Sequence, residues 1–163
     1  PATGQLSQPS DMNIIDYNKE GTAMLQDGIF ARASWLAEGN NKDIAIRFLR
    51  ASFRGWIFCR DNPSTCVEYV LKAGTALGKG HQTWQMNEIN PLIWPSPNGI
   101  GIMDKALYDQ TVQIARQAKI LKADPSPDAY RTDLAEEALK GIQEDTKGLN
   151  FQKGTVTVTE GGN

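Results

Sequence analysis

Apolar residues recur at intervals of three and four in several stretches of this chain, and each stretch predicts a helix. The stretch from Asp43 to Arg60 gives the strongest signal. Its small and apolar stripe, which we expect to face a core, comprises Ala45, Phe48, Leu49, Ser52, Phe53, Trp56 and Ile57. On another side of the same helix lies a row of arginines, Arg47, Arg50 and Arg54. We interpret this row as a solvated face rather than an anion site.

Weaker patterns predict four further helices. Residues 26–38 carry apolar residues on one face and end at Gly39 and Asn40. Asn62 and Pro63 begin a helix that Gly74 terminates. Two more helices are predicted, one from a cap at Asp104 to about Leu121 and one from Thr132-Asp133 to about Ile142.

Strand signals are few. Residues 12–18, MNIIDYN, are apolar and partly alternate, which predicts a strand followed by a turn. In the tail, Val156 and Val158 alternate with threonines, which indicates a short edge strand or a frayed end. The pattern as a whole predicts a helix-rich α/β chain with five or six helices and two or three short strands.

Residues 80–104 show no steady period, although they hold two tryptophans, three prolines and His81. Exposed aromatic and aliphatic surface costs about 25 cal/mol per Å², so a solvated linker of this composition is unfavourable. We therefore predict a packed, irregular loop that lines a site or seals a domain edge.

The charge balance narrows the choice of partners. The chain has 163 residues, 17 basic and 19 acidic, for a net charge of −2. This balance gives no positive electrostatic potential that would attract nucleic acid or an anionic membrane surface. No apolar run approaches the roughly 18 residues needed to span a bilayer, and no leader pattern opens the chain. Residues 1–11 are polar, and we expect a flexible segment there.

Cys59 and Cys66 are seven positions apart and lack the companions of a zinc site or a redox CxxC motif. We interpret them as two half-buried thiols beside a turn between helices. The alternative is a disulfide across that turn, which requires an environment outside the cytosol.

Motifs for catalysis and cofactors are missing from the sequence. His81 is the only histidine, no GxSxG motif is present, and the glycine pairs lack phosphate-loop spacing, so we expect no catalytic residue, metal or cofactor. A binding surface remains. Trp84 and Trp94 are suited to stacking on a flat ligand, with Glu20 and Glu88 among the polar side chains that would orient it.

Four segments together resemble part of a known family: EGTAMLQDGIFARASWL, AIRFLRASFRGWIFCRDNP, HQTWQMNEINPLIWPSPNGIGIMD and YRTDLAEEAL. In this order they resemble the later part of the solute-binding proteins of ABC importers, in the nitrate, taurine and thiamine-precursor class. The match runs from about Asp16 over most of the chain.

The resemblance implies part of a two-lobed, periplasmic-binding-protein-like fold of the second type. Residues 12–163 would form the C-terminal portion, with a hinge strand at about 12–25. It also implies a non-enzymatic protein, periplasmic or otherwise extracytoplasmic, that binds a small polar or aromatic solute and passes it to an inner-membrane ABC permease. Partners would include the N-terminal lobe of the same protein or a second copy, and the ligand residues would be Glu20, Thr22, Trp84, Glu88 and Trp94.

Two alternatives remain from other classes. A related enzyme of thiamine-pyrimidine synthesis would need a catalytic group such as His81. A homo-oligomeric module with no small ligand would instead show a concentration-dependent dimer and no thermal shift with solutes.

Overall fold

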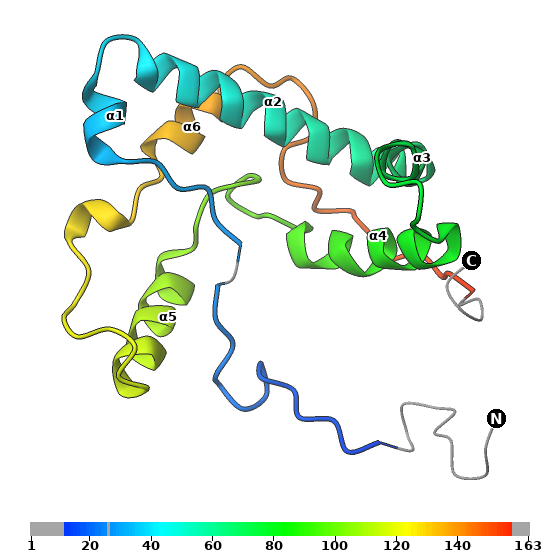
Figure 1. Ribbon diagram of the computed structural model, residues 1–163, viewed down its shortest axis with the longest axis horizontal. Helices are drawn as coiled ribbons and strands as arrows, with labels where there is room; N and C mark the ends of the chain where they lie inside the picture. Colours follow the sequence, from blue (N-terminus) through cyan, green and yellow to red (C-terminus); the bar gives the residue numbers. More distant parts are fainter. Residues whose placement is uncertain (1–11, 26, 158–163) are drawn as a thin grey trace. The chain divides into compact units, whose positions relative to one another are not determined.

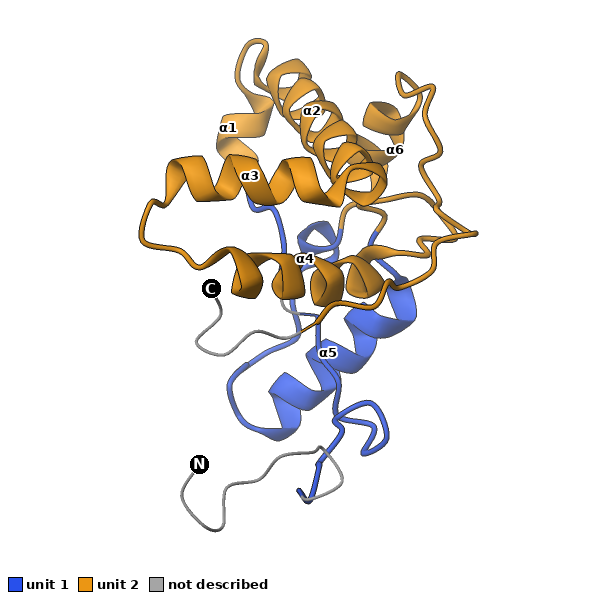
Figure 2. Ribbon diagram, turned by 90° about the vertical axis from the view of Figure 1, so that its right-hand side faces the viewer, with its two compact units in different colours: residues 1–30, 103–130 blue, residues 31–102, 131–163 orange. Residues whose placement is uncertain are grey.

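The computed structural model describes residues 12–25 and 27–157, and it divides the chain into two units. Unit 1 combines residues up to 30 with residues 103–130, and unit 2 combines residues 31–102 with the remainder (Figure 2). Each unit is therefore assembled from segments that are distant in the sequence. The segments predicted at residues 1–11 and at Val158 lie outside the described residues.

The described residues of unit 2 form five helices, labelled in Figure 1. They are α1 (Ala33–Ala37), α2 (Asn41–Asp61), α3 (Pro63–Ala73), α4 (Lys79–Ile93) and α6 (Asp133–Leu139). Helix α2 packs against α6, and α3 lies beside α4. The predicted helices at 43–60 and 62–74 are confirmed, as is the one that begins at Thr132-Asp133, although α6 ends at Leu139 rather than near Ile142.

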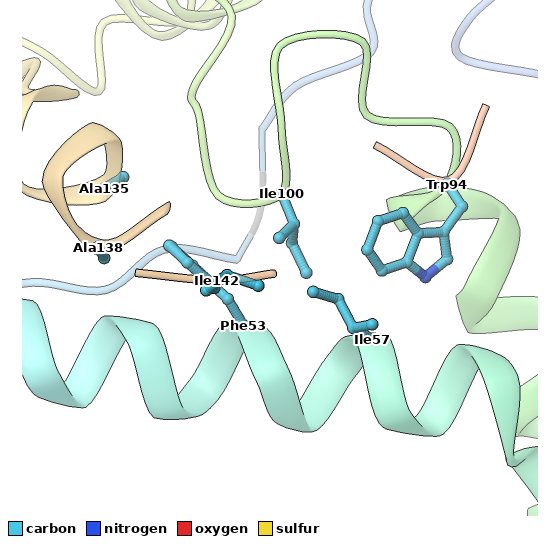
Figure 3. Packing of buried hydrophobic residues seen from close by; sticks show 7 residues of the cluster. All are labelled: Phe53, Ile57, Trp94, Ile100, Ala135, Ala138 and Ile142. Carbon is cyan, nitrogen blue, oxygen red and sulfur yellow. The ribbon is translucent and has the colours of Figure 1, made fainter. Parts of the chain in front are cut away.

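The core of unit 2 forms where α2 meets α6 and the loop after α4. Its buried members are Phe53, Ile57, Trp94, Ile100, Ala135, Ala138 and Ile142 (Figure 3). Gly101 has φ +80°, and a Cβ atom there would collide with the ring of Phe53. Glycine at this position therefore allows the loop backbone to lie directly against α2.

Unit 1 contains α5 (Lys105–Gln117) and the short 3-10 helix Pro127–Ala129. Asp104 caps α5 as predicted, because its carboxylate accepts a hydrogen bond from the backbone N–H of Leu107 at 3.0 Å. Residues near the start of the chain join this helix through two hydrogen bonds. The backbone N–H of Leu25 donates to Thr111, and the Gln110 amide donates to the carbonyl of Ala23.

The predicted α/β class is wrong, because the described residues form helices, turns and irregular segments without a strand. Residues 17–21 form a turn in place of a hinge strand, closed by a hydrogen bond from the N–H of Thr22 to the carbonyl of Tyr17. Val156 lies in a segment with no regular secondary structure. Short alternating runs form strands only when another strand supplies their hydrogen bonds, and neither run has such a partner here.

Two further predictions are wrong at the level of elements. The first half of the segment predicted as an irregular loop is the helix α4. The helix predicted over 26–38 is confined to the five residues of α1. The stripe predicted to face the core also needs correction, because Phe48 is 59% exposed whereas Phe53 and Ile57 are buried.

Candidate functional site

The exposed side of α4 carries an aromatic and polar surface. His81, Trp84 and Glu88 are spaced three and four residues apart, which places them on one face of the helix. The rings of His81 and Trp84 have centroids 5.9 Å apart and are tilted by 35°. Trp84 remains 40% exposed, so part of the indole is accessible to a flat or apolar molecule. We call His81, Trp84 and Glu88 the α4 face.

Glu88 already has an ionic partner within unit 2. Its carboxylate accepts a hydrogen bond from Lys153 Nζ at 2.6 Å, which joins α4 to the segment that follows α6. Both side chains are partly exposed, at 36% and 45%. A polar ligand at Trp84 would therefore meet a neutralised pair at this end of the α4 face, rather than a lone negative charge.

Trp94 lies in the core rather than on a ligand surface. It is 2% exposed, and the guanidinium of Arg60 lies 4.6 Å from its ring centroid. Among the described residues, its indole nitrogen and the Asn90 amide oxygen are buried without a hydrogen-bond partner. Each such group costs roughly 1–3 kcal/mol, so the burial of the large indole must outweigh that cost.

Glu20 and Thr22 belong to unit 1, in the turn that replaces the predicted hinge strand. Both are exposed, and the backbone N–H of Glu20 donates to the carbonyl of Asp16 at 3.0 Å. The five predicted ligand residues are thus divided between two units. The structure brings only Trp84 and Glu88 together, on the α4 face.

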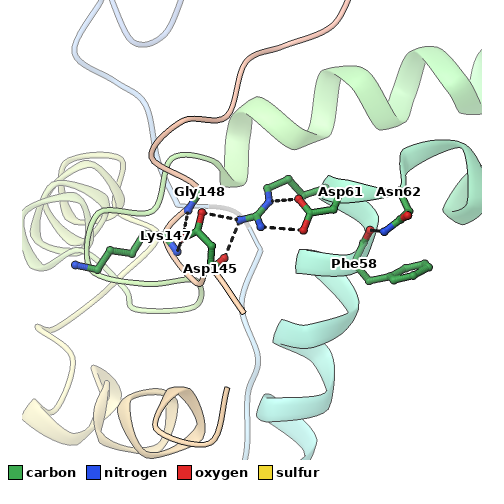
Figure 4. A network of polar contacts seen from close by, with 7 residues as sticks. Phe58, Asp61, Asn62, Asp145, Lys147 and Gly148 are labelled. Atoms are coloured by element: carbon green, nitrogen blue, oxygen red, sulfur yellow. Dashed lines mark hydrogen bonds and ion pairs between the residues drawn. The ribbon is translucent and has the colours of Figure 1, made fainter. Parts of the chain in front are cut away.

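Arg60 is the most enclosed cation of the described residues that form ion pairs, with a side chain only 8% exposed. It forms a two-pronged ion pair with Asp61 and also donates to the carbonyl of Asp145 at 2.8 Å (Figure 4). The hydrogen bond to Asp61 is the largest cause of the raised pKa of Arg60. This arrangement is structural, because it fixes the end of α2 against the loop at Asp145.

Asp145 organises that loop. Its carboxylate accepts hydrogen bonds from the backbone N–H groups of Lys147 and Gly148, at 2.9 and 3.0 Å. These two bonds lower the pKa of Asp145, with a smaller contribution from the charge of Arg60. Sequence analysis missed the cluster because Arg60 and Asp145 are far apart in the chain and belong to no recognised motif.

A shallow basic hollow lies at the C-terminal end of α5, lined by Arg116, Gln117, Lys119, Leu121 and Lys122. Arg116 pairs with Asp124 and donates to the carbonyl of Leu121. Cations are favoured at a helix C-terminus, where unpaired carbonyl groups carry partial negative charge. Helix capping therefore accounts for this cluster without a bound anion.

The two cysteines form a disulfide with each other. Cys59 and Cys66 are bonded, so the interpretation as thiols is wrong, and the bond joins the last turn of α2 to the first turn of α3. The described residues also contain no group of three or more His, Cys, Asp or Glu placed to hold a metal ion.

No family model, curated protein or solved structure was found to match this chain. Within the part of the chain that the structure describes, no helix has both the length and the apolar character to cross a membrane. The class that the structure defines by itself is helical, in two units, with one disulfide between consecutive helices.

Proposed function

We propose that this chain is a helical part of a solute-binding component for ABC-type import, and that the α4 face forms one wall of its ligand site. The observation that carries the proposal is the half-exposed Trp84 beside His81, on the segment where the resemblance to solute-binding proteins is most specific. Stacking on an indole suits a planar or partly apolar solute.

The opposite wall of the site comes from further polypeptide in this proposal. The α4 face is open on a helix surface, and most ligand sites bury the larger part of a small molecule. Large apolar side chains are also exposed on several other helices, including Phe48 on α2 and Tyr69 on α3. Surfaces of this kind favour association with another polypeptide.

The disulfide supports a location outside the cytosol. Disulfides persist in oxidising compartments, including the bacterial periplasm, and are rare where glutathione and thioredoxin keep thiols reduced. The Cys59–Cys66 bond agrees with the periplasmic location that the resemblance implies.

The first test is native mass spectrometry of the protein from its natural source. We expect the polypeptide that contains Trp84 to be part of a larger covalent chain or of a complex with a different chain. That species is then titrated with taurine and with an aminopyrimidine, and binding is followed by thermal shift and by tryptophan fluorescence.

We expect Trp84→Ala to weaken binding of whichever probe is bound by about tenfold or more, because base-like and aromatic stacking contributes on the order of 1–3 kcal/mol. Tyr69→Ala is the matched control, since Tyr69 is an exposed aromatic residue on a neighbouring helix. Equal loss in both variants, or no loss in Trp84→Ala, would contradict the proposal. Turnover of the bound probe that disappears in His81→Ala would instead favour the enzyme.

A further inference from the structure

The disulfide at the corner between α2 and α3 has one accessible half and one buried half. Cys59, in the last turn of α2, is partly exposed, whereas Cys66, in the first turn of α3, is only 5% exposed. In thiol–disulfide exchange an attacking thiolate must reach one of the two sulfur atoms, and the rate depends on that access. A thiol that arrives from solution therefore meets Cys59 rather than Cys66.

The helix surface next to Cys59 is open. Gly55 lies four residues before Cys59, so the two positions share one face of α2 and are about one turn apart. Side chains on a helix lean toward its N-terminus, so the space above Gly55 borders the side chain of Cys59. A Cβ atom at Gly55 would meet nothing within 4 Å. This space is therefore available to a thiol that approaches Cys59.

Nothing in the packing of α2 requires glycine at position 55. Gly55 lies inside a helix of 21 residues and is not among the glycines with positive φ in the described part of the chain. Glycine is among the least favourable residues in a helix interior, and no described residue approaches Gly55 so closely that a side chain there would collide. Access to Cys59 gives this glycine a role that packing does not.

Cys66 is placed to leave as a thiolate. Its backbone N–H donates to the carbonyl of Asn62 at 3.3 Å, which begins the hydrogen-bond ladder of α3. Backbone N–H groups in the first turn of a helix have no partner within the helix, and they favour negative charge nearby. Cysteine thiolates are stabilised at helix N-termini, and a more stable thiolate leaves faster. The sulfur that is hidden from attack is therefore also suited to be the leaving group.

The corner between α2 and α3 does not depend on the disulfide alone. The backbone N–H and the side-chain amide of Asn62 both donate to the carbonyl of Phe58, at 2.8 and 3.1 Å (Figure 4). Val67, the residue after Cys66, is 2% exposed and anchors α3 by packing. With these contacts in place, the two thiols of an opened bond stay close to each other. The bond can therefore open and re-form without unfolding of the chain.

We propose that the Cys59–Cys66 bond is a site of reversible thiol–disulfide exchange with a dithiol, and that exchange enters through Cys59. The redox poise of the compartment decides whether the bond is opened or closed, and the same mixed disulfide at Cys59 forms in both directions. The proposal does not depend on the identity of the solute or on the α4 face.

The exchange proceeds in two displacements. A thiolate of the dithiol attacks Sγ of Cys59 and forms a new S–S bond, while the bond to Cys66 breaks and its electron pair leaves on Cys66, which is then protonated by water. The second thiolate of the dithiol attacks the sulfur of its own partner and releases Cys59 as a thiolate. The dithiol is oxidised to a disulfide by two electrons, and the Cys59–Cys66 bond is reduced to two thiols.

The first experiment traps the mixed disulfide on the full, oxidised chain. The probe is a thioredoxin whose second active-site cysteine is replaced by serine, so that the first displacement is not followed by the second. Free thiols are then blocked with iodoacetamide. Trypsin cleaves after Arg60, which lies between the two cysteines, so Cys59 and Cys66 fall on separate peptides for mass spectrometry. We expect at least about tenfold more adduct on the Cys59 peptide.

The second experiment measures the role of Gly55. Gly55→Leu places a side chain beside Cys59, and we expect it to slow opening of the bond by dithiothreitol at least about threefold. Ala51→Leu adds a similar side chain one turn further from Cys59, at an exposed position, and is the matched control with an unchanged rate. The Gly55→Leu chain should remain folded, because the added Cβ meets nothing. Circular dichroism checks this for both variants.

Reversibility is tested on the reduced chain. Oxidised glutathione should restore the Cys59–Cys66 bond, and helical circular dichroism should be retained throughout. Loss of the helical signal on reduction would contradict an exchange that occurs within the folded chain.

The chain unfolded in urea is the reference for accessibility, since both cysteines are then exposed. Adduct divided between the two peptides in the folded chain as it is in the unfolded chain would overturn the proposal. Absence of adduct until urea is added would also overturn it, because the bond would then be purely structural. Equal rates of opening in Gly55→Leu and Ala51→Leu would exclude the surface above Gly55 as the route to Cys59.

Discussion

Gly101 allows the backbone to lie directly against the core of unit 2. Its φ of +80° is unfavourable for other residues, and a Cβ there would collide with Phe53. We predict that Gly101→Ala lowers the free energy of unfolding by about 3 kcal/mol, through the combined cost of the left-handed conformation and overpacking. Urea denaturation followed by circular dichroism measures this change. A loss below about 1 kcal/mol would mean that the loop is not held against α2.

Asp145 makes the stability of the folded protein depend on pH in the acid range. Its pKa in the folded state is lowered by the hydrogen bonds from Lys147 and Gly148, so folding favours the ionised form. The stabilisation is complete above the unfolded pKa of about 4, and it is lost as the pH falls through the lower folded pKa. We predict that unfolding becomes easier below about pH 4.

Asp145→Asn should reduce this acid sensitivity, because asparagine keeps an acceptor oxygen but has no charge to titrate. Denaturant unfolding across the acid range compares the variant with the original chain. Asp133→Asn is the comparison variant. The pKa of Asp133 is also lowered, but mainly by a side-chain hydrogen bond from Arg131 rather than by backbone N–H groups. If Asp145→Asn loses stability in acid as steeply as the original chain does, Asp145 is not the source of the acid sensitivity.

At the scale of elements, the disulfide fixes the corner between α2 and α3. It closes a loop of about eight residues, for which the chain-entropy relation gives a stabilisation of about 2.5 kcal/mol. We predict that the double variant Cys59→Ser/Cys66→Ser loses about this amount in chemical denaturation. Reductant should destabilise the original chain and leave the double variant unchanged. An equal loss of stability on addition of reductant in both proteins would show that the disulfide does not stabilise the fold.

Sequence patterns predicted the elements whose signals are local. Asp104 caps α5 by its own side chain, and Pro63 is suited to the first turn of α3, so neither boundary depends on distant residues. Helix α4 was missed because its apolar residues do not form a clear stripe and Pro91 lies within its last turn. The disulfide was not favoured because a spacing of seven brings two cysteines together only when the turn at Asn62 has the right geometry.

At the scale of the whole molecule, the periodicity of α2 predicted a helix but not which side would be buried. Phe48 and Phe53 are equally apolar, and only the distant α6 and the loop at Ile100 decide that Phe53 is the inner residue. For the candidate site, the sequence likewise could not predict which tryptophan would be accessible to a ligand. Trp84 and Trp94 both belong to the segment 80–104, whose pattern did not separate them, yet the core encloses Trp94 and leaves Trp84 exposed.

The α/β prediction failed for a related reason. Strands need partners, and the alternating runs near Ile14 and Val156 have none among the described residues. Helices satisfy their backbone hydrogen bonds internally, so they form wherever one apolar side finds a neighbour. This difference explains why the helical elements were predicted more successfully than the strands.

The contrast between the buried Trp94 and two of the other three tryptophans provides an internal optical reporter. Trp94 is enclosed beneath Arg60, whereas Trp56 and Trp84 are each 40% exposed on α2 and α4. A soluble quencher such as acrylamide should therefore reach Trp56 and Trp84 and spare Trp94 while the chain is folded. Once the partly buried Trp35 is replaced by phenylalanine, the emission that survives quenching reports whether the core around Trp94 is intact. The quenched emission reports whether a bound molecule covers Trp56 or Trp84.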